Sequence, residues 1–137
     1  MRCTIDLQTL SALRFASDFH LAYGHALLAV TGLFMSKSRI PIGLIFSRSG
    51  PYQMMAGEML KSAQMAIDEI NADDQFGFQL EPHLRDPGGV VAAYHTACED
   101  LIRDTGVDHI VGCYTSASRK QVLPIIERTD RLLWHPA

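Results

Sequence analysis

Short apolar runs alternate with amphipathic helical patterns over most of this chain, and this alternation constrains the fold more than any other feature of the sequence. The first apolar run covers residues 40–46 and is nearly continuous, as expected for a strand that is buried on both faces. Apolar residues then recur at helical spacing up to about residue 71. Strands that alternate with helices are typical of right-handed βαβ units. The sequence therefore predicts an α/β fold with a doubly wound parallel sheet.

Three more strands and two more helices are predicted downstream, the strands at residues 78–85, 108–113 and 131–134 and the helices at about residues 90–105 and 118–130. Pro82 lies inside the second strand, and because proline lacks a backbone N–H, that strand is predicted at a sheet edge. The predicted strand order is therefore 2-1-3-4. Gly106 stands where a helix-ending glycine is expected, and Pro124 is predicted to kink or restart the last helix. The three helices should bury apolar faces made of Leu60, Ala63, Ile67 and Ile70, of Tyr94, Ala97 and Leu101, and of Val122, Ile125, Ile126 and Thr129.

The chain divides at about Met35, where the regular alternation begins. Residues 1–34 show no sustained strand–helix pattern, and we interpret them as an upstream extension that is poorly ordered or non-native. The apolar stretch at residues 26–35 is too short to span a bilayer and lacks the positive start of a secretory signal. No helix follows the last strand, so one face of the sheet would lack cover. We therefore expect residues 35–137 to be a truncated part of a longer protein.

Composition excludes several function classes. Of the 137 residues, 47% are hydrophobic and 20% are charged, and the net charge is −3, as in an ordinary globular protein. No basic stripe is present, so direct nucleic-acid binding is not predicted. The apolar stretch at residues 26–35 is too short for membrane insertion to be predicted. The three cysteines are odd in number and widely spaced, which predicts no disulfide framework and no metal site. No cofactor is predicted.

A cluster of hydroxyl side chains follows the third predicted strand and marks the candidate binding site. The strand stops at Gly112, and the hydroxyl-bearing residues Tyr114, Thr115, Ser116 and Ser118 come directly after it. In open parallel sheets, ligands bind outside the carboxyl ends of the strands, where helix N-termini offer free N–H groups. The alternative is a helix cap, because Ser118 followed by Gln121 fits a capping box. A cap and a ligand contact can coexist.

Two catalytic alternatives use residues of the same region. Cys113 with His109 or His135 resembles a thiol nucleophile with its base, but a cysteine at a strand end more often packs as a small apolar residue. Ser116 does not lie in the Gly-x-Ser-x-Gly pattern of a nucleophile elbow. The residues therefore favour binding over catalysis.

Two further pairs of residues are candidate sites. His95 and Cys98 are three residues apart on a predicted helix and would make half of a metal site, but no second pair accompanies them. Arg119 and Lys120 lie early in the last helix, where cations are disfavoured. They are either solvated or face an anionic ligand group or an acidic partner.

Several short motifs carry a family resemblance over residues 40–137. They are Ile-Gly-Leu-Ile-Phe-Ser at 42–47, Asp-Pro-Gly-Gly at 86–89, Cys-Glu-Asp-Leu-Ile-Arg at 98–103, Gly-Cys-Tyr-Thr-Ser at 112–116, Arg-Lys at 119–120 and Pro-Ile-Ile-Glu-Arg at 124–128. In this order and spacing, the chain resembles the first lobe of type I periplasmic binding proteins. It is most similar to the amide-sensing negative regulators of aliphatic amidase operons and to urea and short-chain-amide binding proteins. The resemblance implies two doubly wound lobes that close on a ligand.

The resemblance also implies which residues would bind that ligand. In the amide-sensing members, the tyrosine and the serine of Gly-Cys-Tyr-x-Ser line the pocket, and they correspond to Tyr114 and Ser116, with Thr115 between them. A second pocket segment reads Tyr-Pro-Thr in those members. Here that segment reads His-Pro-Ala, so that His135 and Ala137 replace the tyrosine and the threonine.

The function implied by this resemblance is non-enzymatic sensing of a short-chain aliphatic amide or urea. The sensor would be cytoplasmic, would regulate amidase expression through an antiterminator-type partner, and would be compatible with a homo-oligomer. The alternative of the same class is the substrate-binding component of a urea, amide or branched-chain amino-acid type ABC transporter, which would be periplasmic and would dock on an ABC permease. The alternative of another class is a Cys- or Ser-dependent hydrolase.

Overall fold

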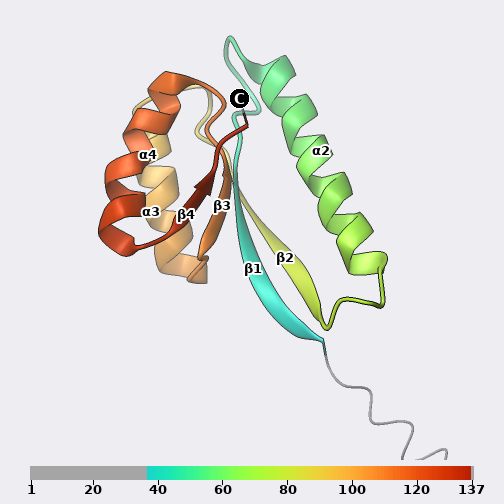
Figure 1. Ribbon diagram of the computed structural model, residues 1–137. Coiled ribbons are helices and arrows are strands. Elements are labelled where there is room, and N and C mark those ends of the chain that lie inside the picture. Colours follow the sequence, from blue (N-terminus) through green and yellow to red (C-terminus); the bar gives the residue numbers. More distant parts are fainter. Residues whose placement is uncertain (1–36, 137) are drawn as a thin grey trace, which may run out of the picture. The chain divides into compact units, whose positions relative to one another are not determined.

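The computed structural model describes residues 37–136, which form a four-stranded parallel sheet with helices on both faces (Figure 1). In chain order the elements are β1 (Ser38–Ile45), α2 (Gln53–Ala72), β2 (Phe78–Arg85), α3 (Ala93–Thr105), β3 (His109–Gly112), α4 (Ser116–Thr129) and β4 (Leu132–Trp134). The interpretation of residues 1–34 and the candidate site residue Ala137 lie outside the described residues.

The strand order is β2-β1-β3-β4, and each pair of neighbours is parallel, as predicted. Pro82 lies on β2, at an edge of the sheet, and is paired in register with Ile42 of β1. β1 occupies the middle of the sheet because it pairs with both β2 and β3. This explains why residues 40–46 form a nearly continuous apolar run.

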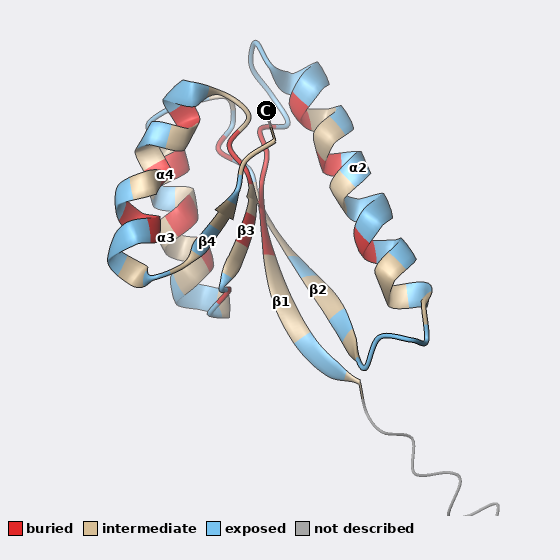
Figure 2. Ribbon diagram, in the orientation of Figure 1, coloured by how far each residue is buried: buried red, intermediate tan, exposed pale blue. Residues whose placement is uncertain are grey.

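The two faces of the sheet are covered by different elements. Helices α3 and α4 pack on one face and α2 packs on the other (Figure 1). Buried residues lie on the inner sides of all three helices and along the upper parts of β1 and β3 (Figure 2). The predicted inner faces are confirmed, although Ala63, Ile70, Ala97 and Thr129 are only partly buried.

Some predicted boundaries are wrong by two or three residues. β1 begins at Ser38 and α3 at Ala93, whereas the sequence pattern predicted residues 40 and about 90. α4 also does not restart at Pro124 but runs through it. Proline removes one intrahelical hydrogen bond, yet Val122, Ile125 and Ile126 are buried on either side of it, and their packing holds the helix together.

Helix ends follow local rules in two places. Gly106 adopts the left-handed conformation after α3, and its N–H bonds to the carbonyl of Ile102 at 2.9 Å, as predicted. The capping prediction for α4 is wrong in its residues. Thr115, not Ser118, is the N-cap, and the capping box pairs Thr115 with Ser118 rather than Ser118 with Gln121. The helix starts two residues earlier than its apolar periodicity indicates because its first turn is polar.

Candidate functional site

The loops that follow β1, β2 and β3 meet at the carboxyl end of the sheet and surround a cavity of about 150 Å³. This is the location that parallel sheets offer to ligands. The volume is smaller than that of a typical small-molecule pocket, which is about 300–1,000 Å³. The lining residues carry hydroxyl, aromatic or small side chains: Ser47, Ser49, Pro51, Tyr52, Ala56, Gly89, Val91, Tyr94, Tyr114 and Thr115. None of these lining residues is an acid, a lysine, an arginine or a histidine.

Close backbone contact between two loops forms one wall of this cavity. A side chain on Gly89 would overlap the backbone of Ser49 and Gly50, and both glycines have positive φ angles of 76° and 84°. The Asp86 carboxylate accepts the backbone N–H groups of Arg48 at 3.1 Å and Gly88 at 2.8 Å. The Asp-Pro-Gly-Gly turn therefore joins the loop after β2 to the loop after β1.

Two buried hydroxyl groups lie where these loops meet α3. The Oγ atom of Ser47 and the phenol oxygen of Tyr94 are 2.9 Å apart, and the Ser47 Oγ atom accepts the N–H of Gly89 at 3.1 Å. Ser47 is 3% exposed and Tyr94 is 8% exposed. Burial raises the pKa of Tyr94, while the hydrogen bond with Ser47 acts in the opposite direction. Tyr94 is therefore a neutral phenol at physiological pH.

Two further tyrosines of the cavity lining contact each other. The rings of Tyr52, which directly precedes α2, and Tyr114, which follows β3, lie edge to face with centroids 6.1 Å apart. Tyr52 is 55% exposed and Tyr114 is half-buried. Exposed aromatic faces beside a cavity suit contact with an apolar or planar ligand group.

A strained turn at the end of β3 directs the chain toward Tyr114. Gly112 has φ of 143°, and a side chain there would overlap the carbonyl group of Ile45. Cys113 has φ of 61°, which is rare for a residue with a side chain, and its N–H bonds to the same carbonyl at 3.3 Å. Only glycine permits this approach of β3 to β1.

The predicted site residues that the structure describes separate into two groups. Tyr114 and Thr115 line the cavity, but the Thr115 hydroxyl donates to Ser118 Oγ at 2.9 Å and accepts the Ser118 N–H at 3.1 Å. Ser116 is exposed at the start of α4, and neither it nor His135 is among the lining residues. Ligand contact by any of these residues stays a prediction.

Sequence reasoning missed the lining residues that come from the other two loops. Ser47, Ser49 and Tyr52 follow the first strand just as the predicted cluster follows the third, so the same rule could have found them. The sequence pattern places Tyr94 only on the core face of its helix. Its aromatic ring does pack in the core, while its hydroxyl reaches Ser47.

The catalytic alternative finds no support in the surroundings of Cys113. Its side chain is buried, and burial raises the pKa of this thiol to about 12 and that of Cys98 to about 11. A nucleophilic cysteine needs the opposite shift. Within residues 37–136, no group of His, Cys, Asp and Glu side chains could hold a metal ion. Over the same residues, no helix has the length and apolar character needed to cross a membrane.

The comparison with protein families agrees with this geometry. A family model described as a periplasmic binding protein domain matches residues 40–137. The chain belongs to this family. The resemblance to type I periplasmic binding proteins is thereby confirmed at the level of the family, while the amide-sensing subtype is not.

Solved structures of this family share the fold. The branched-chain amino acid transporter substrate binding protein LivJ from Streptococcus pneumoniae, in complex with isoleucine, is 28% identical with a TM-score of 0.65 and covers 70% of this chain. A leucine binding protein from Thermotoga maritima is 22% identical with a TM-score of 0.65 and covers 72%. A solute binding protein of an ABC transporter from Rhodopseudomonas palustris, in complex with 3,4-dihydroxy benzoic acid, is 16% identical with a TM-score of 0.63 and covers 69%.

These relatives are much longer than the chain. It spans 28%, 27% and 26% of their respective lengths.

Proposed function

We propose that this chain forms part of the ligand-binding unit of a substrate-binding protein that serves an ABC transporter. The observation that carries this proposal is the cavity at the carboxyl end of the sheet, which is lined by hydroxyl and aromatic groups and by no charged side chain. Such a surface binds and orients a small molecule, and its lining holds no carboxylate, imidazole or amine that could activate one of its hydroxyl groups.

The printed names of the relatives favour transport over sensing. LivJ is named for branched-chain amino acid transport, and the protein from Rhodopseudomonas palustris is named as a solute binding protein of an ABC transporter. The natural partners of this chain would then be a small solute and a membrane permease. A periplasmic or extracellular location accompanies this function, in place of the cytoplasmic one that the amide-sensor resemblance implied.

Amide sensing is the second candidate, and the position of Tyr114 favours it. The Gly-Cys-Tyr-Thr-Ser motif brings this tyrosine to the cavity, as the resemblance to the amide-sensing members implies. The two candidates differ in the ligand, which is an amino acid or another organic solute for transport and a short-chain amide or urea for sensing.

The test is a titration of the ¹⁵N-labelled chain followed by NMR, which detects the weak binding expected of half a site. Isoleucine, leucine, acetamide, urea and 4-hydroxybenzoate are added in turn at concentrations up to tens of millimolar. We expect at least one probe to shift the amide resonances of the cavity, at residues 47–56, 89–94 and 114–115. Preference for an amino acid or the aromatic acid supports transport, and preference for acetamide or urea supports sensing. If none of the five probes shifts these resonances, the proposal of a ligand-binding lobe is wrong.

A further inference from the structure

The buried hydroxyl pair of Ser47 and Tyr94 lies in the wall of the cavity, where the loop after β1 meets α3. The two residues are 47 positions apart in the sequence, and both are more than nine-tenths buried. Both also line the cavity, so each is buried by protein on most sides and open toward the site. A buried hydroxyl group that faces a cavity is costly unless its hydrogen finds an acceptor.

Counting the hydrogens of this pair leaves one without an acceptor. Ser47 and Tyr94 carry two hydroxyl hydrogens, and one of them forms the bond between the two oxygens. The Ser47 oxygen also accepts the N–H of Gly89. This bond uses one acceptor position of Ser47 and provides no acceptor for either hydroxyl hydrogen. Ser47 is the single hydrogen-bond partner of the Tyr94 hydroxyl within residues 37–136. One O–H group of the pair is therefore left to face the cavity.

The direction of the chain of bonds indicates which hydrogen this is. Ser47 accepts the Gly89 N–H, and a hydroxyl that accepts one hydrogen bond becomes a stronger donor in the next. Either oxygen can donate in the bond between Ser47 and Tyr94. When Ser47 donates, the bonds run from Gly89 to Ser47 to Tyr94, and the free hydrogen is that of the phenol.

We infer that Tyr94 is a specificity-determining residue of this site and that its hydroxyl donates a hydrogen bond to a carbonyl or carboxylate oxygen of the ligand. This inference rests on the proposed ligand-binding function and names the ligand class more closely. The rest of the lining suits an apolar ligand body, because Pro51, Ala56 and Val91 are apolar and the Tyr52 and Tyr114 rings also line the cavity. A ligand that combines an acceptor oxygen with a compact apolar body fits both features, and isoleucine has both while urea has only the first.

The experiment compares wild type with Tyr94→Phe, which removes the phenol oxygen and keeps the ring that packs in the core. Isoleucine and acetamide are titrated into both proteins by NMR. The probe that binds wild type should bind Tyr94→Phe about tenfold more weakly, the loss expected for one hydrogen bond to a buried acceptor. Ser62→Ala is the matched control. The Ser62 hydroxyl is exposed on α2 and bonds only to the Glu58 carbonyl, so this variant should leave the Kd unchanged.

A second ligand separates recognition from loss of structure. 2-Methylbutylamine is isoleucine without its carboxylate and offers no acceptor oxygen, so wild type and Tyr94→Phe should bind it equally weakly. If Tyr94→Phe weakens the amine and isoleucine by the same factor, the tyrosine is only structural and the inference is wrong. It is also wrong if Tyr94→Phe binds isoleucine or acetamide as tightly as wild type does. If wild type binds neither isoleucine nor acetamide but binds another of the five probes, the inference is wrong and the ligand-binding function stands. If none of the five probes binds, the ligand-binding function itself fails, and the inference fails with it.

Discussion

The two faces of the sheet are built from similar apolar patterns but are buried to different extents. On the α3 and α4 face, the core includes Cys98, Leu101, Val107, Ile110 and Val122, each of which is 0% exposed. On the α2 face, Leu44 and Phe46 are buried near the top of β1, whereas Ile42, Leu80 and Val111 are only partly buried. We call these the closed face and the open face.

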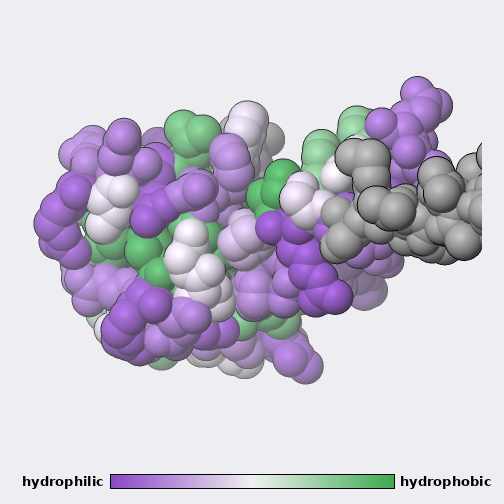
Figure 3. Space-filling model, turned by 90° about the horizontal axis from the view of Figure 1, so that it is seen from below, coloured by the Kyte–Doolittle hydropathy of each residue, from purple (hydrophilic) through white to green (hydrophobic). Residues whose placement is uncertain are grey.

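The difference follows from the number of helices on each face. Among the described residues 37–136, helices α3 and α4 cover the closed face and α2 is the one helix on the open face (Figure 1). Beside α2, an apolar groove is lined by residues of all four strands, including Ile40, Val111 and Trp134. Trp134 and Leu132 are 57% and 55% exposed, and hydrophobic residues are visible among hydrophilic ones on the side of the molecule shown in Figure 3. How far an apolar residue is buried therefore depends on the elements that pack around it and not on its own hydrophobicity alone.

The largest expected effect comes from truncating one leucine on each face. Leu101→Ala leaves a cavity on the closed face and should lower the free energy of unfolding by about 3 kcal/mol. Leu80→Ala, on the open face, should cost about 1 kcal/mol because solvent already reaches this side chain. Urea denaturation of both variants measures the difference. Equal losses would mean that the two faces do not differ in packing.

A smaller effect is expected at the start of α4, where the closed face depends on a local signal as well as on packing. Thr115→Ala removes the capping box and should lower the free energy of unfolding by about 1 kcal/mol. Thr115→Ser retains the hydroxyl and should restore most of that loss. A destabilised serine variant would show that the threonine methyl group matters more than the cap.

Thiol reactivity measures how far solvent reaches the closed face, and this measurement needs no large change in stability. In a Cys3→Ser background, Cys98 and Cys113 should stay unreactive toward Ellman's reagent up to pH 9, because burial raises the pKa of both thiols. Leu132→Cys adds a thiol at an exposed position of the neighbouring strand β4 and should react within minutes. Rapid labelling of the two native cysteines would show that the closed face opens readily.

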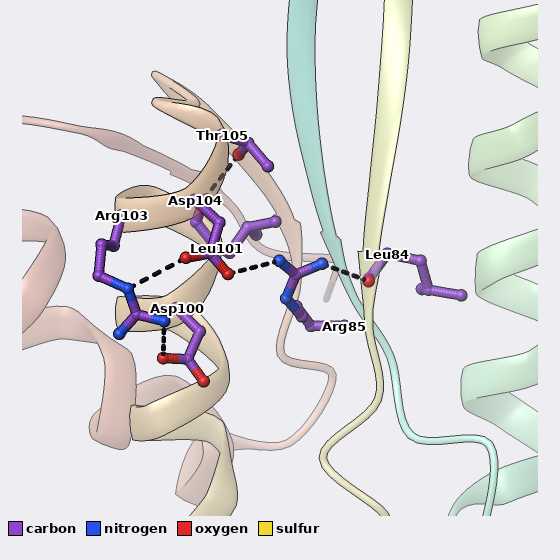
Figure 4. A network of polar contacts seen from close by, with 7 residues as sticks. All are labelled: Leu84, Arg85, Asp100, Leu101, Arg103, Asp104 and Thr105. Carbon is purple, nitrogen blue, oxygen red and sulfur yellow. Dashed lines mark hydrogen bonds and ion pairs between the residues drawn. The ribbon is translucent and has the colours of Figure 1, made fainter.

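The smallest effect is expected at the polar network on the edge of the closed face (Figure 4). Arg85 of β2 and Arg103 of α3 contact Asp104 at 3.1 and 3.0 Å. Desolvation raises the pKa of Asp104, but hydrogen bonds from Arg103 and Arg85 together lower it. A lowered carboxyl pKa stabilises the fold above the ordinary pKa, and this contribution is lost as the pH falls through the folded-state value.

Asp104→Asn should therefore reduce the unfolding temperature slightly at pH 7, and the difference from wild type should shrink toward pH 3. Thermal unfolding across this range measures it. Surface ion pairs contribute little, so a loss as large as that of Leu101→Ala would contradict this account.

Sequence by itself determined the elements and much of their arrangement. The alternation predicted the parallel sheet, Pro82 placed β2 at an edge, and Gly106 marked the end of α3. These signals are local, because period, proline and glycine act through the backbone of neighbouring residues. The same local rule, that ligands bind after parallel strands, led to Tyr114 and Thr115 in the cavity wall.

Only the tertiary structure decided which hydroxyl groups meet and which apolar residues are buried. Ser47 and Tyr94 come together because β1 and α3 pack on each other, which no pattern of neighbouring residues reports. Thr115 and Ser118 look alike in the sequence, yet the turn after β3 makes the first the cap and the second its partner. Leu101 and Leu80 are equally hydrophobic, and the two helices on one face and the single helix on the other determine how far each is buried.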